Sequence, residues 1–370
     1  ESADMNQVKT PLRKEGNFLK EVKDKQDKDY VEGEVIVKFK EQEIDLEGPL
    51  ASIETVVFEI AHDVDVKDEV EDLNVVLVES DKSTSQLVDE LKNDPKVERV
   101  TPNYIRRVAV TPDDASFANL WGLNNTGQTV NGVTGTGDAD IDAPEAWNLE
   151  TVEQADVIVA GLDTGVLYDH PDLTTNMWDG SSCNDENGDA IVGGCPNHGW
   201  DFFSNDNNPT DEDGHGTHVA GIIASVSNNS IGISGLSIGN NLKIMALRFI
   251  GPDGGFLFDE IRAINFARHN GAKVINASFV ASGFVQEEQD AIDAFSGLFV
   301  AAAGNGGEDS VGDDNDDADP QYPCSMTSSN VICVAATDQN DNLASFSNYG
   351  LTSVDVGAPG VNIYSTYLSD

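Results

Sequence analysis

Apolar runs that alternate with helical stretches fill the sequence from Trp121 onward, and this alternation constrains the fold most strongly. Uninterrupted apolar runs are typical of strands buried on both faces of a parallel sheet. They occur at Val157–Leu162, Leu242–Leu247, Val274–Phe279, Leu298–Ala302 and Val331–Ala336, and the helical stretches between them at His218–Val226, Asp259–His269 and Glu287–Phe295. The pattern predicts an α/β fold, a doubly wound and mostly parallel sheet with helices on both faces.

A smaller pattern precedes this region. Residues 1–30 are charged and weakly hydrophobic, which predicts a flexible leader. Residues 31–108 contain three strand-like runs and one helical stretch, at Glu34–Lys40, Leu73–Val78, Val97–Tyr104 and Ser83–Asn93. We therefore expect a small α+β domain over residues 31–108 and the α/β domain over residues 109–370.

The charge balance is strongly acidic and uneven. The 370 residues include 66 acidic and 21 basic ones, a formal net charge of −45, and only 5 of the basic residues lie in 112–370. This balance argues against binding of nucleic acid or anionic membrane through a basic surface. The excess of acidic residues suits a salty extracellular medium, where dissolved ions screen the repulsion between carboxylates. No apolar run approaches the ~20 residues that a membrane-spanning helix needs.

The four cysteines form two short-range pairs, Cys183 with Cys195 and Cys324 with Cys333. Their even number and local spacing predict two disulfides in an oxidising compartment, hence a secreted protein. The alternative is a tetrahedral metal site, although no Cys-x-x-Cys pair is present.

Three polar residues stand at or near the ends of expected strands, where α/β sheets place their chemistry. Asp163 ends the first apolar run, His215 lies between two glycines, and Asn305 follows a strand of small residues within Gly-Asn-Gly. An aspartate that orients an imidazole suits general acid–base work. An exposed amide can donate a hydrogen bond to charge that develops on a carbonyl oxygen. Taken singly, Asp163 and Asn305 are also explained as ordinary turn residues.

A metal site is the alternative use of this region, because His215 and His218 lie three residues apart. The zinc-protease pattern His-Glu-x-x-His is not met, since its glutamate is missing. We expect His218 to be a structural residue on the inner face of its helix.

In their order, the segments Asp163-Thr-Gly, His215-Gly-Thr-His-Val-Ala-Gly and Ala-Ala-Gly-Asn305 resemble the subtilisin-like serine proteases, the subtilases. The resemblance covers roughly residues 115–370. It implies a serine endopeptidase that acts on proteins and peptides. In that role Asp163 orients the imidazole, His215 takes the proton of the nucleophile, and Asn305 donates to the oxyanion.

The resemblance also implies substrate-binding segments. One contains Ser278, Phe279 and Val280 and pairs with the substrate backbone by β-augmentation. The facing segment contains Gly254, Gly255 and Phe258. Subtilases usually carry glycine where this chain has Val280, so we expect a narrowed entrance to the first specificity pocket.

The family's tight calcium site has matching residues, namely Asp172, Asn229 and the carbonyls of Ile231 and Ile233. They are hard oxygen donors, as Ca²⁺ requires. A second acidic cluster, which is a candidate for a weaker site, contains Asp185, Asn187 and Asp189.

Residues 31–108 resemble the subtilisin propeptide. This implies a ferredoxin-like domain that assists folding and acts as an intramolecular inhibitor until it is removed, so that the chain would be a zymogen.

The family's nucleophile motif, Gly-Thr-Ser-Met-Ala, does not occur in the sequence, and Ser365 and Ser369 lack its flanking glycine. We therefore expect these 370 residues alone to be inactive and to expose apolar surface. The alternative to a protease is a non-catalytic subtilase-like binding module.

Overall fold

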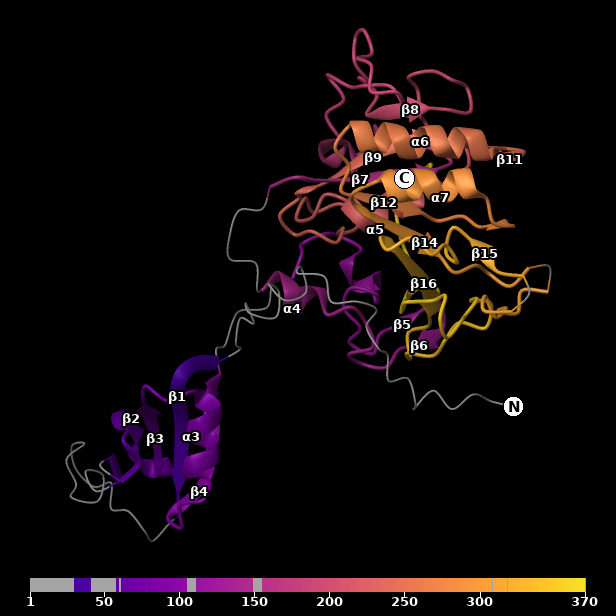
Figure 1. Cartoon of the computed structure of the whole chain (residues 1–370). Helices are drawn as coiled ribbons and strands as arrows, with labels where there is room; N and C mark the ends of the chain where they lie inside the picture. Colours follow the sequence, from indigo (N-terminus) through magenta and orange to yellow (C-terminus); the bar gives the residue numbers. More distant parts are fainter. Residues whose placement is uncertain are drawn as a thin grey trace. The chain divides into compact units, whose positions relative to one another are not determined.

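The computed structural model describes residues 30–40, 58–59, 61–104, 111–148, 155–307, 309–317 and 319–369. The chain divides into two compact units, Glu1–Val108 and Ala109–Asp370, which are considered separately (Figure 1). The expected leader, residues 1–30, lies outside the described residues except for Tyr30.

The first unit is an antiparallel sheet of strand order β2-β3-β1-β4, with helix α3 packed on β1 and β4. Ser83 begins α3 as part of a capping box with Gln86. This strand order with a helix before the last strand is ferredoxin-like, as expected. The elements are β1 (Tyr30–Phe39), β2 (Asp65–Val70), η2 (Glu71–Leu73), β3 (Val75–Glu79), α3 (Thr84–Leu91) and β4 (Val97–Tyr104).

The second unit is built around a seven-stranded parallel sheet of order β17-β16-β14-β12-β7-β9-β8. Its strands are β7 (Val157–Asp163), β8 (Gly199–Asp201), β9 (Leu242–Arg248), β12 (Val274–Ala277), β14 (Leu298–Ala302), β16 (Val331–Thr337) and β17 (Val356–Pro359). Its three longer helices are α5 (His215–Ala224), α6 (Leu257–His269) and α7 (Gln286–Ala294).

Alternate residues of the central strands face opposite sides of this sheet. Val159 of β7 belongs to the same buried cluster as Ala220 and Ala224 of α5. Ala160 and Leu162 belong to a second cluster, which includes residues of α6 and α7. Helix α5 therefore covers one face, and α6 and α7 lie side by side on the other (Figure 1). The predicted doubly wound α/β fold is confirmed.

Two of the boundaries that differ from the sequence prediction affect the site. Helix α5 begins at His215 instead of His218. Strand β12 ends at Ala277, so Ser278 and Phe279 follow the strand instead of belonging to it. Parallel pairing of β12 with both neighbours stops at Ala277, which leaves the next backbone groups outside the ladder.

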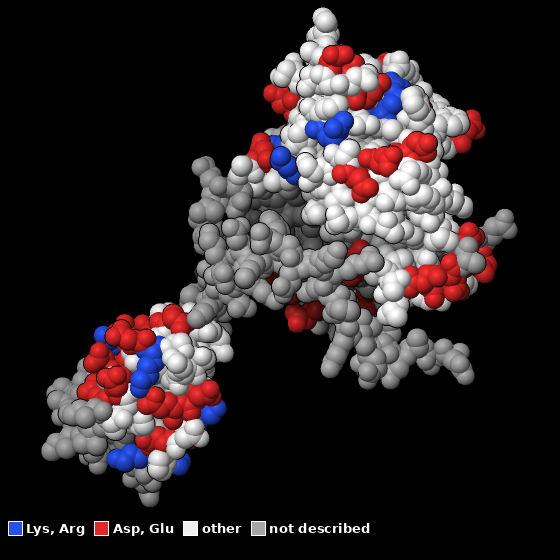
Figure 2. Space-filling view, in the orientation of Figure 1, with Lys and Arg blue, Asp and Glu red and all other residues white. Residues whose placement is uncertain are grey.

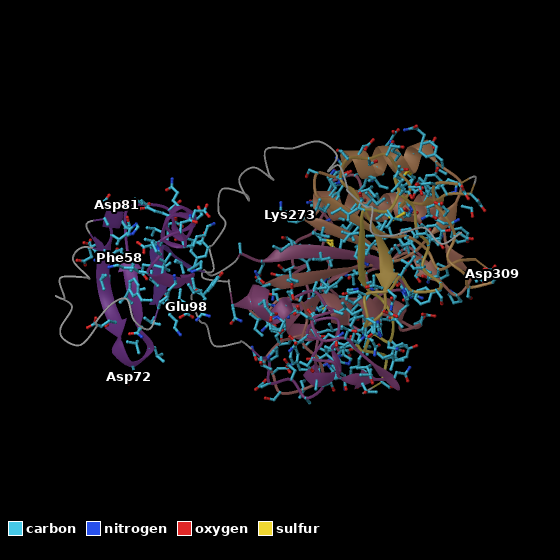
Figure 3. The ribbon with its side chains drawn as sticks, turned by 90° about the horizontal axis from the view of Figure 1, so that it is seen from below. Phe58, Asp72, Asp81, Glu98, Lys273 and Asp309 are labelled. Carbon is cyan, nitrogen blue, oxygen red and sulfur yellow. A yellow bond between two sulfur atoms is a disulfide. The ribbon has the colours of Figure 1, made fainter. Side chains whose placement is uncertain are left out.

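Shorter elements and two disulfides complete the second unit. The predicted Cys183–Cys195 and Cys324–Cys333 bonds are both formed (Figure 3). The short elements are η3 (Phe117–Asn119), β5 (Thr129–Val130), β6 (Val133–Thr134), α4 (Ala143–Trp147), η4 (Thr174–Asn176), β10 (Ile250–Gly251), β11 (Gly254–Gly255), β13 (Ala281–Ser282) and β15 (Gln321–Tyr322).

Acidic side chains are spread over the viewed face of both units, with few Lys or Arg among them in the second (Figure 2). Across the part of the chain that the structure describes, no helix has the length and apolar character to span a membrane.

Candidate active site

The candidate active site lies where β7 ends and α5 begins. Nδ1 of His215 is 2.7 Å from Oδ1 of Asp163, and because a carboxylate only accepts, the imidazole donates this bond. The Asp163 side chain is 3% exposed and that of His215 is 51% exposed. No other hydrogen bond reaches the His215 ring from the described residues, so Nε2 is the nitrogen available to a reacting group.

The electrostatics suit a general base. The hydrogen bond to Asp163, together with the charge of that carboxylate, raises the pKa of His215 above its ordinary value. Burial opposes the rise, whereas the charges of Asp213 and Asp211 add to it. The imidazolium that forms when His215 takes a proton is therefore stabilised where it forms.

Asp211 organises the start of α5, and the sequence analysis missed it. Its Oδ1 accepts from the amides of Asp213 and Gly214, both at 3.0 Å, and its Oδ2 accepts from the amide and hydroxyl of Thr217, at 2.9 and 2.6 Å. Gly214 takes a left-handed φ of 109° at the cap position. One carboxylate thus satisfies the Thr217 amide of the first turn and the amides of the two residues that precede the helix, so the helix can begin at His215. The available signal was an aspartate just before a helix start.

Asn305 follows β14 at the same edge of the sheet as Asp163. Strand β12 lies between β7 and β14, and Ala277 is paired with Leu162 on one side and Ala301 on the other. Because the three strands run parallel in this register, Asp163, Ser278 and Asn305 follow neighbouring strand ends.

The turn that presents Asn305 depends on its glycine neighbours. Gly304 and Gly306 take left-handed φ angles of 114° and 66°, whereas Asn305 is not among the residues of positive φ. Asn348 braces the turn, since its amide donates to the Gly304 carbonyl at 2.9 Å and its side chain accepts from the Gly306 amide at 2.8 Å. Asn305 itself is exposed. The backbone therefore gives no reason for an asparagine here, which favours a chemical role over the turn interpretation.

The two expected substrate segments carry exposed apolar side chains. Gly254 and Gly255 form β11, which pairs with β10, and Phe258 lies in the first turn of α6 with 72% of its surface exposed. Val280 is 41% exposed. The ring of Phe279 packs against Phe249, with 4.9 Å between centroids.

The expected calcium residues converge on one loop. Asp172 is 1% exposed, and its carboxylate accepts from the Asn229 side chain at 2.7 Å and from the Ile233 amide at 2.8 Å. Asp114, which the sequence analysis missed, is 5% exposed and accepts from the amides of Asn228 and Asn229. Burial raises the pKa of Asp172, and the Asp114 charge adds to that rise.

No described Lys or Arg pairs with the buried carboxylates of Asp172 and Asp114. Two such carboxylates suit a cation that is bound by hard oxygen donors. The carbonyls of Ile231 and Ile233 belong to the same loop as Asn229. The described residues contain no group of three or more His, Cys, Asp or Glu side chains that could together hold a metal ion. A site here would therefore depend on amide and carbonyl oxygens as well as on carboxylates.

The other candidates have local roles. The Asp185 carboxylate accepts from the amides of Asn187 and Asp189, both at 2.9 Å, which lowers its pKa. It is satisfied by its own loop, which does not favour a second cation site. His218 is half-buried, and desolvation lowers its pKa. The hydroxyl of Ser365 donates to the His218 carbonyl at 2.6 Å instead of meeting His215.

Comparison with known proteins agrees with this geometry. The family model described as Subtilase family matches residues 154–370, and the model described as Fervidolysin N-terminal prodomain matches residues 17–103. The chain is 37% identical over 343 residues to Thermophilic serine proteinase of Bacillus sp. (strain AK1), across 91% of this chain and 72% of that protein. It is 39% identical over 235 residues to Thermitase of Thermoactinomyces vulgaris, across 62% of this chain and 72% of that protein.

Among solved structures, proteases from Pseudoalteromonas arctica align with a TM-score of 0.51 and 28% identity, across 68% of this chain and 73% of that one. The parallel sheet, the Asp163–His215 pair and the matched regions lead to one assignment. This chain belongs to the subtilase family of serine endopeptidases, which hydrolyse peptide bonds, and it carries an N-terminal prodomain.

Proposed function

We propose that the protein is the zymogen of a secreted subtilisin-like endopeptidase that uses an Asp-His-Ser triad and an asparagine oxyanion donor. The observation that carries the proposal is the 2.7 Å hydrogen bond between the exposed imidazole of His215 and the buried carboxylate of Asp163. A His held in this way, beside neighbouring strand ends, suits proton transfer to and from a bound peptide.

The chemistry follows from these groups. Nε2 of His215 would take the proton of a serine hydroxyl as its oxygen attacks the scissile carbonyl, and would later give that proton to the leaving amine. Asp163 would hold the ring and stabilise its cation. The Asn305 amide would donate to the oxyanion of the tetrahedral intermediate. Two backbone segments are proposed to pair with the substrate. One follows Ala277 and lies outside the hydrogen-bond ladder of the sheet, and the other is Gly254–Gly255.

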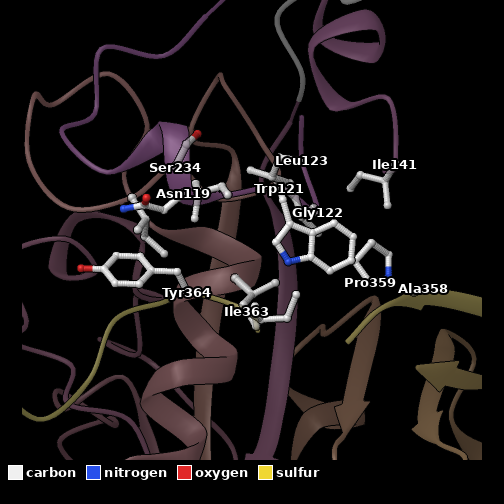
Figure 4. Close-up of a pocket in the computed structure, with 14 residues that line it drawn as sticks. Asn119, Trp121, Gly122, Leu123, Ile141, Ser234, Ala358, Pro359, Ile363 and Tyr364 are labelled. Carbon is white, nitrogen blue, oxygen red and sulfur yellow. The ribbon is translucent and has the colours of Figure 1, made fainter. Parts of the chain in front are cut away.

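The nucleophile needs a segment that approaches α5. An apolar cavity of about 260 Å³ lies beside this helix, and Trp121, Ile222, Ile363 and Tyr364 are among the residues that line it (Figure 4). We propose that the segment carrying the serine packs over this cavity. The apolar lining of the cavity supports this proposal, because apolar surface is normally covered by another part of the fold.

A serine-directed fluorophosphonate tests the function on protein expressed from the whole gene. We expect one labelled serine, loss of peptide hydrolysis on labelling, and no effect of a zinc chelator. A folded protein that binds peptides but takes up no label would support the binding module, and inhibition by the chelator alone would support the metal hydrolase.

We further propose that residues 31–108 inhibit the peptidase unit and are removed before it acts. The disulfides and the acidic surface support secretion into an oxidising, salty medium, because disulfides persist outside the cytosol and screening weakens repulsion between carboxylates.

Calcium removal should lower thermal stability. We propose that Asp172, Asp114, Asn229 and the carbonyls of Ile231 and Ile233 hold one Ca²⁺, which would neutralise the buried carboxylates. A cation at 100 times its Kd stabilises the folded state by about 2.7 kcal/mol, so chelation should lower the Tm by roughly 5–10 °C.

Thermal unfolding with calcium and with a chelator measures this effect. Asp172→Asn should remove the response to calcium, whereas the control Asp185→Asn should keep it. Identical Tm values with calcium and with chelator in the unsubstituted protein would refute the site.

A further inference from the structure

Two glutamates occupy buried positions that an apolar residue would normally take. Glu260 is 5% exposed and begins the buried stripe of α6, which continues through Ala263 and Ile264. Glu288 is 3% exposed and begins the matching stripe of α7, ahead of Ala291 and Ile292. The two helices pack against each other, so the two carboxyl groups meet between their first turns.

The pair has no cationic partner among the described residues. Oε1 of Glu260 is buried and has no hydrogen-bond donor among the described residues. A proton on one of the two carboxyl groups lets them hydrogen-bond to each other. On the same helices, Asp259 pairs with Arg262, and Glu287 is exposed. Within the part of the chain that the structure describes, Glu288 is the one charged group that acts on Glu260.

One proton shared between two such carboxyls avoids burying two adjacent negative charges. Desolvation, followed by the charge and hydrogen bond of Glu288, raises the pKa of Glu260 to about 9. At neutral pH the pair therefore retains its proton, and in more alkaline solution it loses it.

Helix α6 begins just after Gly254–Gly255, and α7 begins at Gln286, after the segment of Ser278, Phe279 and Val280 and the short strand β13. The amide of Glu260 donates to the carbonyl of Phe256 at 3.0 Å, and Phe256 follows Gly255 of β11. In α7, the amide of Gln289 donates to the carbonyl of Val285 at 3.2 Å, and Val285 ends the segment that begins at Ser278. A change in the spacing of the two first turns would therefore move both segments.

We propose that Glu260 and Glu288 are positioning residues for peptide hydrolysis, in which the shared proton ties α6 to α7 and so sets the distance between the two substrate segments. The inference rests on the proposed function and adds a pH limit on substrate binding. When the proton is lost, repulsion between two buried carboxylates separates the first turns, and the groove fits the peptide less well.

The test uses Glu260→Gln in protein from the whole gene, because a Gln amide can donate to Glu288 but cannot ionise. If only the protonated pair binds well, the apparent KM of the unsubstituted enzyme should rise about tenfold from pH 8 to pH 10 with kcat little changed. The KM of E260Q should stay flat over this range. Glu287→Gln, an exposed neighbour, is the matched control and should behave like the unsubstituted enzyme.

Thermal stability gives a readout that does not need activity. With the pKa raised from 4.5 to about 9, the folded state binds more protons than the unfolded chain between these values, so Glu260 makes stability fall as pH rises through that window. The Tm advantage of E260Q over the unsubstituted protein should grow from pH 5 to pH 9. A hydrogen bond without a titrating proton would give no such growth.

The two proposals fail in distinguishable ways. Equal alkaline rises of KM in E260Q and the unsubstituted enzyme, or a Tm difference that does not change with pH, would overturn the shared-proton role while leaving the protease intact. Absence of fluorophosphonate labelling at pH 7 would instead overturn the protease.

Discussion

We expect Asp163→Asn to lower kcat by about 10⁴-fold, with KM little changed. The carboxylate accepts the Nδ1 hydrogen of His215 at 2.7 Å and is almost fully buried. An amide in its place can present its NH₂ group to the ring, which favours the wrong tautomer, and it cannot stabilise the imidazolium. Steady-state hydrolysis of a peptide substrate by protein from the whole gene measures the loss.

The matched control is Asp213→Asn, two residues before His215. Asp213 is exposed and acts on the imidazole through its charge. Its Oδ1 also accepts from the backbone amide of His215 at 3.3 Å, and the Oδ1 of an asparagine can accept the same bond. We expect a small downward shift of the acidic limb of the pH–rate profile and a kcat within about threefold of the original. If both substitutions have equally small effects, Asp163 does not orient the catalytic base.

We expect Asn305→Ala to lower kcat by about 10²–10³-fold, which corresponds to ~3–4 kcal/mol of transition-state stabilisation. Asn305 is exposed, and its backbone is of ordinary φ, so the substitution should leave Tm and KM nearly unchanged. Stopped assays at high enzyme concentration can measure the residual rate.

Asn187→Ala, at an exposed asparagine on the disulfide-closed loop, is the control and should leave kcat as it was. A loss in KM instead of kcat in the Asn305 variant would assign that side chain to substrate binding and not to the oxyanion.

The sheet was predictable because its strands are buried on both faces. Apolar runs identified β7, β9, β14 and β16 nearly to the residue, and the segments around Asp163 and His215 were sufficient to bring those two side chains together before any coordinates. Strand β2 was missed because Asp65–Val70 is an edge strand that is mostly exposed, so no apolar period marks it.

Other features depend on contacts that the sequence pattern does not contain. The start of α5 is fixed by the Asp211 carboxylate and by the left-handed φ of Gly214. Neither feature appears in the spacing of apolar residues along the sequence. Asp114 reaches the loop at Asn229 only through the tertiary fold. Glu260 and Glu288 are polar residues on apolar stripes, and only the tertiary fold buries them on packed helices, so the sequence pattern does not predict the shared proton that we propose.

The most direct measurement is the NMR titration of the His215 imidazole in the whole chain and in its Asp163→Asn variant. We predict that His215 titrates above its ordinary value of 6.5 in the unsubstituted protein and moves to lower pH in the variant, because the hydrogen bond to the carboxylate is the largest cause of the rise. Identical titrations in the two proteins would contradict the Asp163–His215 pair on which the endopeptidase account rests.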